Sequence, residues 1–263
     1  MHPLVNIAVS AARAGGNFIM RHYERSDQLV IERKSRNDFV TQVDRGAEHE
    51  IISVIRKAYP QHAILAEESG ATGESDVTWI IDPLDGTTNF LHRIPHFAVS
   101  IGIQVKGRLE HGVIYAPCTQ DLYVASRGSG ALLNNRRIRV SNCKDVEQAL
   151  VGTGVPLREE YLPDYLPMLQ RVASQTAGVR RAGSAALDLA YVAAGRFEAF
   201  WEFNLKPWDI AAGIVLVQEA GGSVRELLDE NADPLRTGNV FASGAKLASG
   251  LHSLLVNNQA QAQ

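Results

Sequence analysis

Cysteine is scarce in this sequence, which has two, Cys118 and Cys143, among its 263 residues. They show no Cys-x-x-Cys spacing, so neither a disulfide framework nor a thiolate zinc site is expected. The sequence also lacks any run of about 18 apolar residues, and its N-terminal residues show no basic segment followed by an apolar one. These absences predict a soluble protein of the reducing cytoplasm that has no membrane partner.

An excess of basic charge is missing as well. The 26 lysines and arginines are outnumbered by 29 aspartates and glutamates, which gives a net charge of −3 with histidine neutral. A basic platform for nucleic acid is therefore not the expected function. Hydrophobic residues make up 45% of the chain, and its length exceeds the roughly 100 to 200 residues of one ordinary domain. We expect one large domain or two fused ones.

Two amphipathic helices open the chain. Apolar residues at spacings of three and four predict a helix over 4–22 and a second over 43–58, with Thr41 as a candidate N-cap. Between Phe97 and Val105 apolar residues alternate with small or polar ones, which predicts a strand. Shorter strands are expected over 109–115, 122–125 and 131–140. Residues 1–145 should therefore form helices plus a mainly antiparallel sheet, and this half also contains the candidate metal-binding segment Asp82–Thr87 described below.

After about residue 145 strand-like and helix-like segments alternate, which favours helices packed on a sheet. The alanine-rich segment 184–194 is interpreted as a core-packing helix, and a last helix is expected from Gly244 to Val256. We place a soft boundary at 145–150. The C-terminal half, 146–263, carries Trp208-Asp209, and we expect it to be fused with the first half in one compact unit.

The segment Asp82-Pro83-Leu84-Asp85-Gly86-Thr87 follows an apolar strand and indicates a sharp turn. Two carboxylates three positions apart can face one point, and the Leu84 carbonyl can join them as a hard oxygen ligand of the kind that suits Mg²⁺. A solvated turn is the alternative, because Asp-Pro and Asp-Gly are common turn formers. That alternative gives no reason for a second carboxylate and two threonines beside a strand end.

Carboxylates occur at three further element ends. Glu67-Glu68 follows the strand expected over 63–66, Asp209 opens a helix, and Asp44 lies near the start of the second helix. Each has an ordinary interpretation by itself, as a solvated face or as a helix cap. Considered together, acidic residues from four separate segments can point to one rim.

Other sites are less well supported. His92 and His96 are four apart, but Pro95 argues against the helical face that a zinc pair requires. Gly152-Thr153-Gly154 lacks the third glycine of a dinucleotide fingerprint, and neither a Walker A pattern nor a serine-hydrolase elbow is present. Arg180-Arg181 could bind phosphate or a partner, although such pairs are more often solvated.

Two motifs, more than a hundred residues apart, resemble those of a known protein family. Asp82 through Thr87, with Trp208-Asp209-Ile210-Ala211-Ala212-Gly213 and the later Glu219-Ala220-Gly221-Gly222, resembles both signatures of the inositol monophosphatase family. Met1-His2-Pro3 and Arg180-Arg181 are similar to its bacterial SuhB branch. The resemblance implies an α/β (α+β) layered α-β-α-β-α sandwich of the inositol monophosphatase and fructose-1,6-bisphosphatase type. It also implies a homodimer and Mg²⁺-dependent, Li⁺-sensitive hydrolysis of phosphate monoesters.

The resemblance also implies a ligand set for two or three Mg²⁺ ions in each active site. Glu67, Asp82 and the Leu84 carbonyl would hold the first ion, and Asp82, Asp85 and Asp209 the second. Asp82 would thus bridge the two. A third, weaker site would use Glu67 and water.

The same resemblance implies catalytic and substrate-binding roles. Thr87, assisted by Asp44 and Glu67, would orient and deprotonate the attacking water. The amides of Gly86 and Thr87 would hold phosphate oxygens, and the sugar alcohol would be bound by Asp85, the Ala185 backbone, Glu202 and Asp209. The sequence departs from animal members two residues before Trp208, where Lys206 replaces their histidine. This change makes the substrate rim more cationic.

Two functions from different classes remain open. The first is hydrolysis of myo-inositol 1-phosphate and related small monoesters, with bisphosphates such as fructose 1,6-bisphosphate or phosphoadenosine phosphate as further candidate substrates. The second is regulation, because the SuhB branch is associated with Nus-factor complexes, including NusA and RNA polymerase, that promote ribosomal RNA transcription by antitermination. A net charge of −3 argues that any RNA complex is entered mainly through protein contacts.

Overall fold

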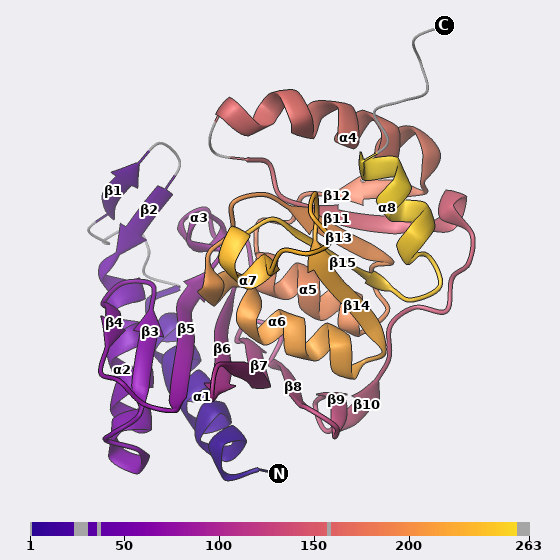
Figure 1. The fold of residues 1–263 in the computed structure, drawn as a ribbon. Coiled ribbons are helices and arrows are strands. Elements are labelled where there is room, and N and C mark those ends of the chain that lie inside the picture. Colours follow the sequence, from indigo (N-terminus) through magenta and orange to yellow (C-terminus); the bar gives the residue numbers. More distant parts are fainter. Residues whose placement is uncertain (1, 24–30, 36–37, 157–158, 257–263) are drawn as a thin grey trace, which may run out of the picture.

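Helices and two β-sheets alternate in five layers. The computed structural model describes residues 2–23, 31–35, 38–156 and 159–256. Within 31–35 and 38–41 it describes only the backbone. Helices α1 (Pro3–Tyr23) and α2 (Gln42–Ala58) cover the outer face of the first sheet, and α5 (Ala185–Ala193) and α6 (Pro207–Glu219) lie between the sheets (Figure 1). Helices α4 (Leu162–Gln175) and α8 (Ala248–Val256) cover the second sheet. The expected α-β-α-β-α sandwich is confirmed.

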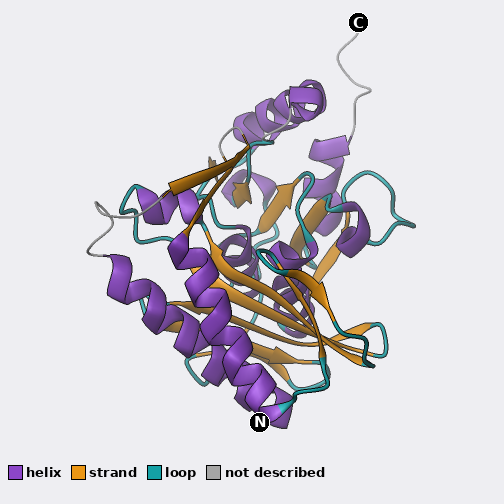
Figure 2. Ribbon diagram, turned by 90° about the vertical axis from the view of Figure 1, so that its left-hand side faces the viewer, coloured by secondary structure: helices purple, strands orange, loops and turns teal. Residues whose placement is uncertain are grey.

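The first two helices pack on each other and on the first sheet through one apolar stripe each. In α1 the buried residues recur three and four apart, and in α2 they are Val43, Ala47, Ile51 and Ile55, with Asp44 and Glu48 also buried. The two helices lie side by side in Figure 2. Gly15 of α1 permits this approach, because a Cβ there would lie 2.7 Å from the Ile51 side chain. The spacing in the sequence predicted both helices to within one residue at each end.

The first sheet is almost entirely antiparallel. Only the pair of β3 and β5 runs parallel among the strand pairs described in this sheet. Its strands, in spatial order, are β10 (Arg136–Ile138), β9 (Gly130–Leu133), β8 (Asp121–Ser126), β7 (Arg108–Ala116), β6 (Ala98–Val105), β5 (Val77–Asp85), β3 (Ala63–Ala66) and β4 (Gly70–Thr72). The hairpin of β1 (Ile31–Ser35) and β2 (Asp38–Thr41), which periodicity did not predict, precedes α2.

The second sheet is mixed and lies in the C-terminal half. Its spatial order is β12 (Gly178–Arg180), β11 (Leu150–Thr153), β13 (Ala199–Glu202), β15 (Val240–Gly244) and β14 (Gly222–Glu226). Gly244 is the last residue of β15, so the helix expected to begin there begins four residues later, at Ala248. The short helix α7 (Pro234–Thr237) and the 3₁₀ turns Val146–Gln148 and Glu159–Tyr161 were not predicted.

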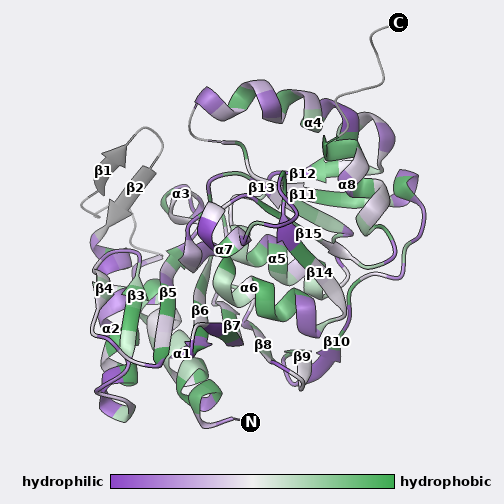
Figure 3. Ribbon diagram, in the orientation of Figure 1, coloured by the Kyte–Doolittle hydropathy of each residue, from purple (hydrophilic) through white to green (hydrophobic). Residues whose placement is uncertain are grey.

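The layer of α5 and α6 is apolar on nearly all sides, because it faces a sheet on each side. The buried part of α6 is continuous from Ile210 to Val217, and α5 is almost as fully buried, which confirms its interpretation as a core-packing helix. Figure 3 shows both helices largely in the hydrophobic colour. The helix α6 packs close to the backbone of the first sheet, because Gly102 and Gly112, on neighbouring strands, face Ala211 and Ala212 and have no side chains.

No helix among the described residues is long and apolar enough to cross a membrane. The last strand of the first sheet ends at Ile138 and the second sheet begins at Leu150. The proposed boundary at 145 falls in this connection, and the division of the chain into two halves there stays a prediction.

Replacing Gly112 by alanine should destabilise the protein, because the added Cβ would overlap the carbonyl oxygen of Ala212 on α6. Forcing α6 away from the sheet should cost about 1 to 3 kcal/mol, measured as a lower urea midpoint. Gly250→Ala is the control, since this position lies on α8 with Val146 Cγ2 at 3.3 Å from the added atom and alanine favours a helix. Equal midpoints for Gly112→Ala and the wild type would contradict the packing argument.

Candidate functional site

The turn after β5 places two aspartates at the edge of the first sheet. The register between β5 and β6 shifts between Asp82, which pairs with Ser100, and Asp85, which pairs with Ala98, so the strand is irregular between the two carboxylates. Asp82 is buried and its Oδ1 accepts a hydrogen bond of 2.9 Å from the Leu84 amide. Gly86 has φ of 98° and precedes the short helix α3 (Thr87–Leu91). A side chain at Gly86 would be strained in this left-handed conformation.

Asp85 connects this turn to the start of α5. Its Oδ2 accepts hydrogen bonds from the Ser184 hydroxyl at 2.5 Å and from the Ala186 amide at 2.8 Å. Ser184 is also the N-cap of α5, since its hydroxyl oxygen accepts a bond from the Leu187 amide. Residues about a hundred positions apart in the chain therefore meet at one carboxylate.

Asn89 of α3 makes a second connection between the same two segments. Its Nδ2 donates to the carbonyl oxygens of His96 at 2.7 Å, Ala182 at 2.9 Å and Gly183 at 3.3 Å. The side chain is 6% exposed. The segment before α5 is therefore held against α3 by an amide as well as by the Asp85 carboxylate.

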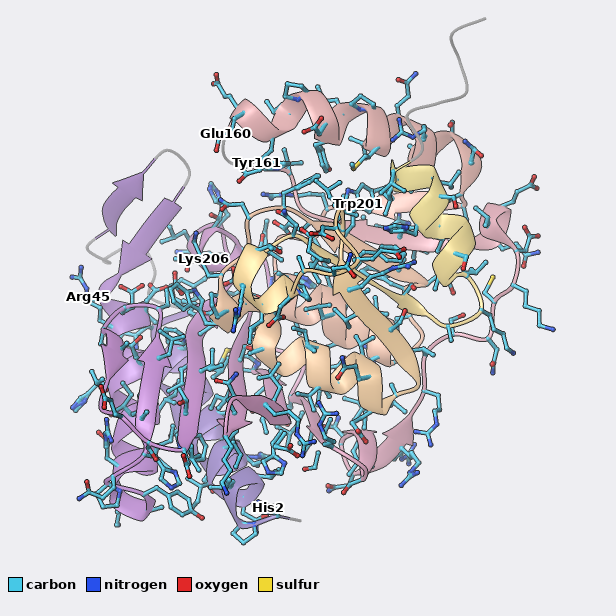
Figure 4. All side chains as sticks on the ribbon, viewed as in Figure 1. His2, Arg45, Glu160, Tyr161, Trp201 and Lys206 are labelled. Atoms are coloured by element: carbon cyan, nitrogen blue, oxygen red, sulfur yellow. The ribbon has the colours of Figure 1, made fainter. Side chains whose placement is uncertain are left out.

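Asp209 enters the site from the first turn of α6. Its Oδ2 accepts a hydrogen bond of 2.7 Å from the Lys206 amide, which closes the first turn of the helix. The Ser100 hydroxyl donates to the Trp208 carbonyl at 3.2 Å and ties this helix start to β6. Lys206 is exposed and lies on the side of the C-terminal half that faces α3 (Figure 4).

Thr87 and Asp44 form a contact pair. The Thr87 hydroxyl lies 2.8 Å from Asp44 Oδ1 and 3.1 Å from the Leu84 carbonyl oxygen. Asp44 is 1% exposed on the first turn of α2. The second helix therefore contributes a buried acceptor directly behind the turn after β5.

Glu67 follows β3, which runs parallel to β5 and thus ends at the same edge of the sheet. Its amide donates to the Ile81 carbonyl at 3.1 Å. The next two amides, of Glu68 and Ser69, donate to the buried Glu48 carboxylate of α2, each at 2.9 Å. These bonds fix the backbone on both sides of the Glu67 side chain.

A cavity of about 220 Å³ lies where these element ends meet. All of the predicted metal and substrate residues line it, namely Glu67, Asp82, Leu84, Asp85, Gly86, Thr87, Ala185, Glu202 and Asp209. Asp44 does not line the cavity and reaches it through Thr87. The carboxylates that the sequence distributes over separate element ends are thus brought to one place. Their roles in catalysis and binding stay predictions.

Two charged lining residues were missed as site residues by sequence reasoning. Arg181 is the basic residue among those that line the cavity, and Asp188 of α5 adds a sixth acidic one. For Arg181 the sequence left phosphate binding, partner binding and a solvated position open. Asp188 lies in an alanine- and leucine-rich segment, a composition that indicates core packing. A single aspartate within so apolar a segment was the feature that could have marked it as a site residue.

Other singled-out residues have structural roles. The Glu219 carboxylate accepts hydrogen bonds from the amides of Gly128 at 2.8 Å and Gly130 at 2.7 Å, so it holds the turn between β8 and β9. His92 is exposed, and His96 is partly buried with its ring 5.9 Å from that of Tyr191. Neither histidine lines the cavity, in agreement with their interpretation as loop or core residues.

Burial and like charge raise the pKa of these acids. Burial, together with Glu67, Asp85 and Asp209, raises the pKa of Asp82 well above its ordinary value. Burial raises the pKa of Asp85 to about 6, against the opposing hydrogen bonds from Ser184 and Ala186. For Glu202, burial and the charge of Asp85 raise the pKa to about 8, while Arg181 acts in the opposite direction. Burial, together with neighbouring carboxylates at Asp82 and Glu202, therefore disfavours their charged forms.

The donor set fits a hard divalent cation. Carboxylate and carbonyl oxygens are the ligands that Mg²⁺ prefers, and a bound cation would reverse the repulsion that raises these pKa values. No group of three or more His, Cys, Asp or Glu side chains within the described ranges is already arranged to hold a metal ion. The fit is therefore one of donor chemistry and location.

Comparison with known proteins finds relatives over nearly the whole chain. The model of the inositol monophosphatase family matches residues 1–261. A Pseudomonas aeruginosa protein named Nus factor SuhB is 52% identical, over 95% of this chain and 95% of its own. The crystal structure of extragenic suppressor protein suhB from Bartonella henselae has a TM-score of 0.95 at 43% identity and covers 98% of this chain and all of its own.

An inositol monophosphatase from Anabaena, with 38% identity and a TM-score of 0.86, covers 96% of this chain and 94% of its own. The coverage is nearly complete in every one of these comparisons. They therefore concern the whole described fold and not the cavity alone. The relatives' names cover two functions, a phosphatase and a Nus factor, and so support a role of one of these kinds.

Glu202→Gln should remove a pH-dependent loss of stability. The carboxyl has an ordinary pKa of 4.5 and a pKa of about 8 in the folded protein, so wild-type stability falls as pH rises between these values. The glutamine side chain carries no charge. The urea midpoint of the variant should therefore exceed that of the wild type by an amount that grows from about pH 5 to about pH 8 and then levels off. The measurement is made with a chelator, and the exposed Glu147→Gln serves as control. An advantage independent of pH would contradict the burial of this charge.

Proposed function

Because the chain belongs to the inositol monophosphatase family, we propose that it is a Mg²⁺-dependent phosphatase of myo-inositol 1-phosphate and related small phosphate monoesters. The observation that carries this proposal is the cavity in which six acidic side chains are accompanied by Arg181 as the basic lining residue. Such a surface repels a phosphate dianion unless cations are bound first. Bound divalent cations would make the acidic cavity compatible with an anionic substrate, which favours a metal-dependent enzyme.

In this proposal Glu67, Asp82, Asp85, Asp209 and the Leu84 carbonyl hold the metal ions, two or three in each site. When bound, Mg²⁺ lowers the pKa of water and neutralises charge on the phosphate and the leaving oxygen. Asp82 is suited to serve two ions, because it is buried and lines the cavity together with Glu67, Asp85 and Asp209.

Thr87 and Asp44 supply the proton path. Because the Thr87 hydroxyl donates to Asp44 at 2.8 Å, its oxygen lone pairs can accept a hydrogen bond from an attacking water. Asp44 is buried and can receive the threonine proton as the water proton moves to Thr87 Oγ1. Glu67 lies at the same cavity and orients the water from the β3 side. No covalent enzyme intermediate is required.

The remaining lining residues bind the substrate. Amide groups of Gly86 and Thr87, at the start of α3, hold phosphate oxygens. The alcohol lies toward the C-terminal half, where Asp85, the Ala185 backbone, Glu202 and Asp209 surround it. Gly154 leaves room for Glu202 there, because a Cβ at position 154 would overlap the Glu202 carboxylate.

Three further properties belong to this proposal: activity in the cytoplasm, inhibition by Li⁺ and assembly as a homodimer. Each follows from the family resemblance and none from the cavity itself. Measuring activity in LiCl tests the inhibition by Li⁺, and sedimentation tests the assembly as a homodimer.

Asp85→Asn should reduce kcat by at least about a hundredfold, because it removes a negative ligand and weakens charge neutralisation in the transition state. Release of phosphate from myo-inositol 1-phosphate at saturating MgCl₂ is the measurement. Asp164→Asn, an exposed acid on the first turn of α4, is the matched control and should retain full activity. Near-normal turnover by a folded Asp85→Asn protein would refute the metal assignment, and no metal-dependent release from any monoester by the wild type would refute the function.

A regulatory role is the second candidate, and a specific observation favours it. The Pseudomonas relative, at 52% identity over 95% of the chain, is named a Nus factor. We propose that this chain associates with NusA, other Nus factors and RNA polymerase through surface outside the cavity. Arg180 on the edge strand β12 is exposed, whereas Arg181 lines the cavity and cannot separate the two roles.

Binding to NusA should survive the loss of catalysis, because a stable interface buries about 800 Å² on each partner, far more than a small cleft offers. In a pull-down with purified NusA, Asp85→Asn should bind like the wild type and Arg180→Ala should bind more weakly. Loss of binding by a folded, inactive Asp85→Asn protein would show that the two roles share the cavity.

A further inference from the structure

Asp188 is a buried acid that none of the catalytic roles above uses. It lies on the first turn of α5, is 1% exposed and lines the cavity. Its Oδ1 is one of the few buried side-chain oxygens that have no hydrogen-bond partner among the described residues. More than about 90% of buried polar groups in proteins are satisfied, so this atom requires an explanation.

Helix capping does not provide one. An acidic residue in a first turn interacts favourably with the helix dipole, but an exposed position would serve that purpose without burying an unpaired oxygen. The N-terminus of α5 is already capped by Ser184, whose hydroxyl oxygen accepts from the Leu187 amide. Asp188 therefore adds little to the helix that Ser184 does not supply.

The charged groups around Asp188 do not balance it either. The Asp188 carboxyl is influenced by two further acids, Glu202 and Asp85, and by one cation, Arg181, and the combined effect of burial and these charges raises its pKa. Such surroundings suit a neutral donor of hydrogen bonds better than another anion. The phosphate end of a substrate must therefore lie away from Asp188, toward the turn after β5.

We propose that Asp188 is a specificity-determining residue whose Oδ1 accepts a hydrogen bond from a hydroxyl group of the substrate's alcohol. The inference rests on the proposed phosphatase function for the phosphate end of that substrate. Asp188 lies three residues after Ala185, on the same helix, and shares the cavity with Glu202. Two acidic acceptors thus face the alcohol, and together they select polyhydric alcohols over alcohols that carry no further hydroxyl.

The physical basis is the cost of an unsatisfied acceptor. A substrate with a hydroxyl at this point pairs with Oδ1, whereas an analogue without that hydroxyl leaves the oxygen buried and unpaired. Sites built to bind a hydroxyl discriminate strongly against analogues that lack it, whereas a missing methylene has a much smaller effect. Asp188 should therefore change which alcohols are bound and should not change how the phosphate is held.

Equilibrium binding of two phosphonates separates these possibilities. Myo-inositol 1-phosphonate and cyclohexylphosphonate share a six-membered ring and differ in its hydroxyls, and neither contains an oxygen bridge to hydrolyse. Calorimetry in MgCl₂ should show that Asp188→Ala lowers affinity for the inositol compound about 10- to 100-fold while affinity for the cyclohexyl compound changes less than about twofold. Asp188→Asn, which retains a carbonyl acceptor in the same volume, should lose less.

The control is Ser243→Ala. Ser243 lies on β15, is fully buried and also has an unpartnered oxygen, but it does not line the cavity. Its removal should leave both affinities unchanged. Equal losses for both phosphonates in Asp188→Ala or Asp188→Asn, or no loss for the inositol compound in a folded variant, would overturn the proposal. Because no turnover is needed, this result is distinct from a failure of the wild type to hydrolyse any monoester.

Discussion

The carboxylate of Asp85 links the first sheet to α5 at the cavity. Asp85 ends β5 of the first sheet and accepts two hydrogen bonds from the start of α5 in the C-terminal half. The position of Asp188 and Ala185 on α5 relative to Asp82 and Thr87 depends on this contact. A group that we propose to bind metal and substrate is therefore also a polar link between the turn after β5 and the start of α5, so both roles constrain the same side chain.

Close packing of α6 on the first sheet also positions the carboxylates. Because Gly102 and Gly112 have no side chains, α6 lies almost against the backbone of the first sheet. Asp209 at the start of α6 thereby reaches the same edge of the sheet as Asp82. The apolar layer between the sheets thus determines how near Asp82 and Asp209 come to each other. Burial of apolar surface on α5 and α6 provides free energy that offsets the repulsion between these carboxylates.

Much of this arrangement follows from the sequence. Periodicity placed both N-terminal helices and β6, and the rule that strand ends and helix starts meet at one edge located the carboxylates. The β1–β2 hairpin was missed because the strand over 31–35 contains three charged residues in succession. Asp188 was missed because a helix facing two sheets is apolar on every side, so one polar residue in it gives no periodic signal. Such positions depend on tertiary contacts that local patterns do not encode.

The amide of Asn89 has a consequence for the ageing of the protein. A single Nδ2 serves three carbonyl oxygens, an arrangement that only a donor can satisfy. Deamidation would place a carboxylate in the same position, where all four oxygens would repel one another and none could donate. Deamidation of one side chain would thus weaken the contact between α3 and the segment before α5, independently of any change at the carboxylates.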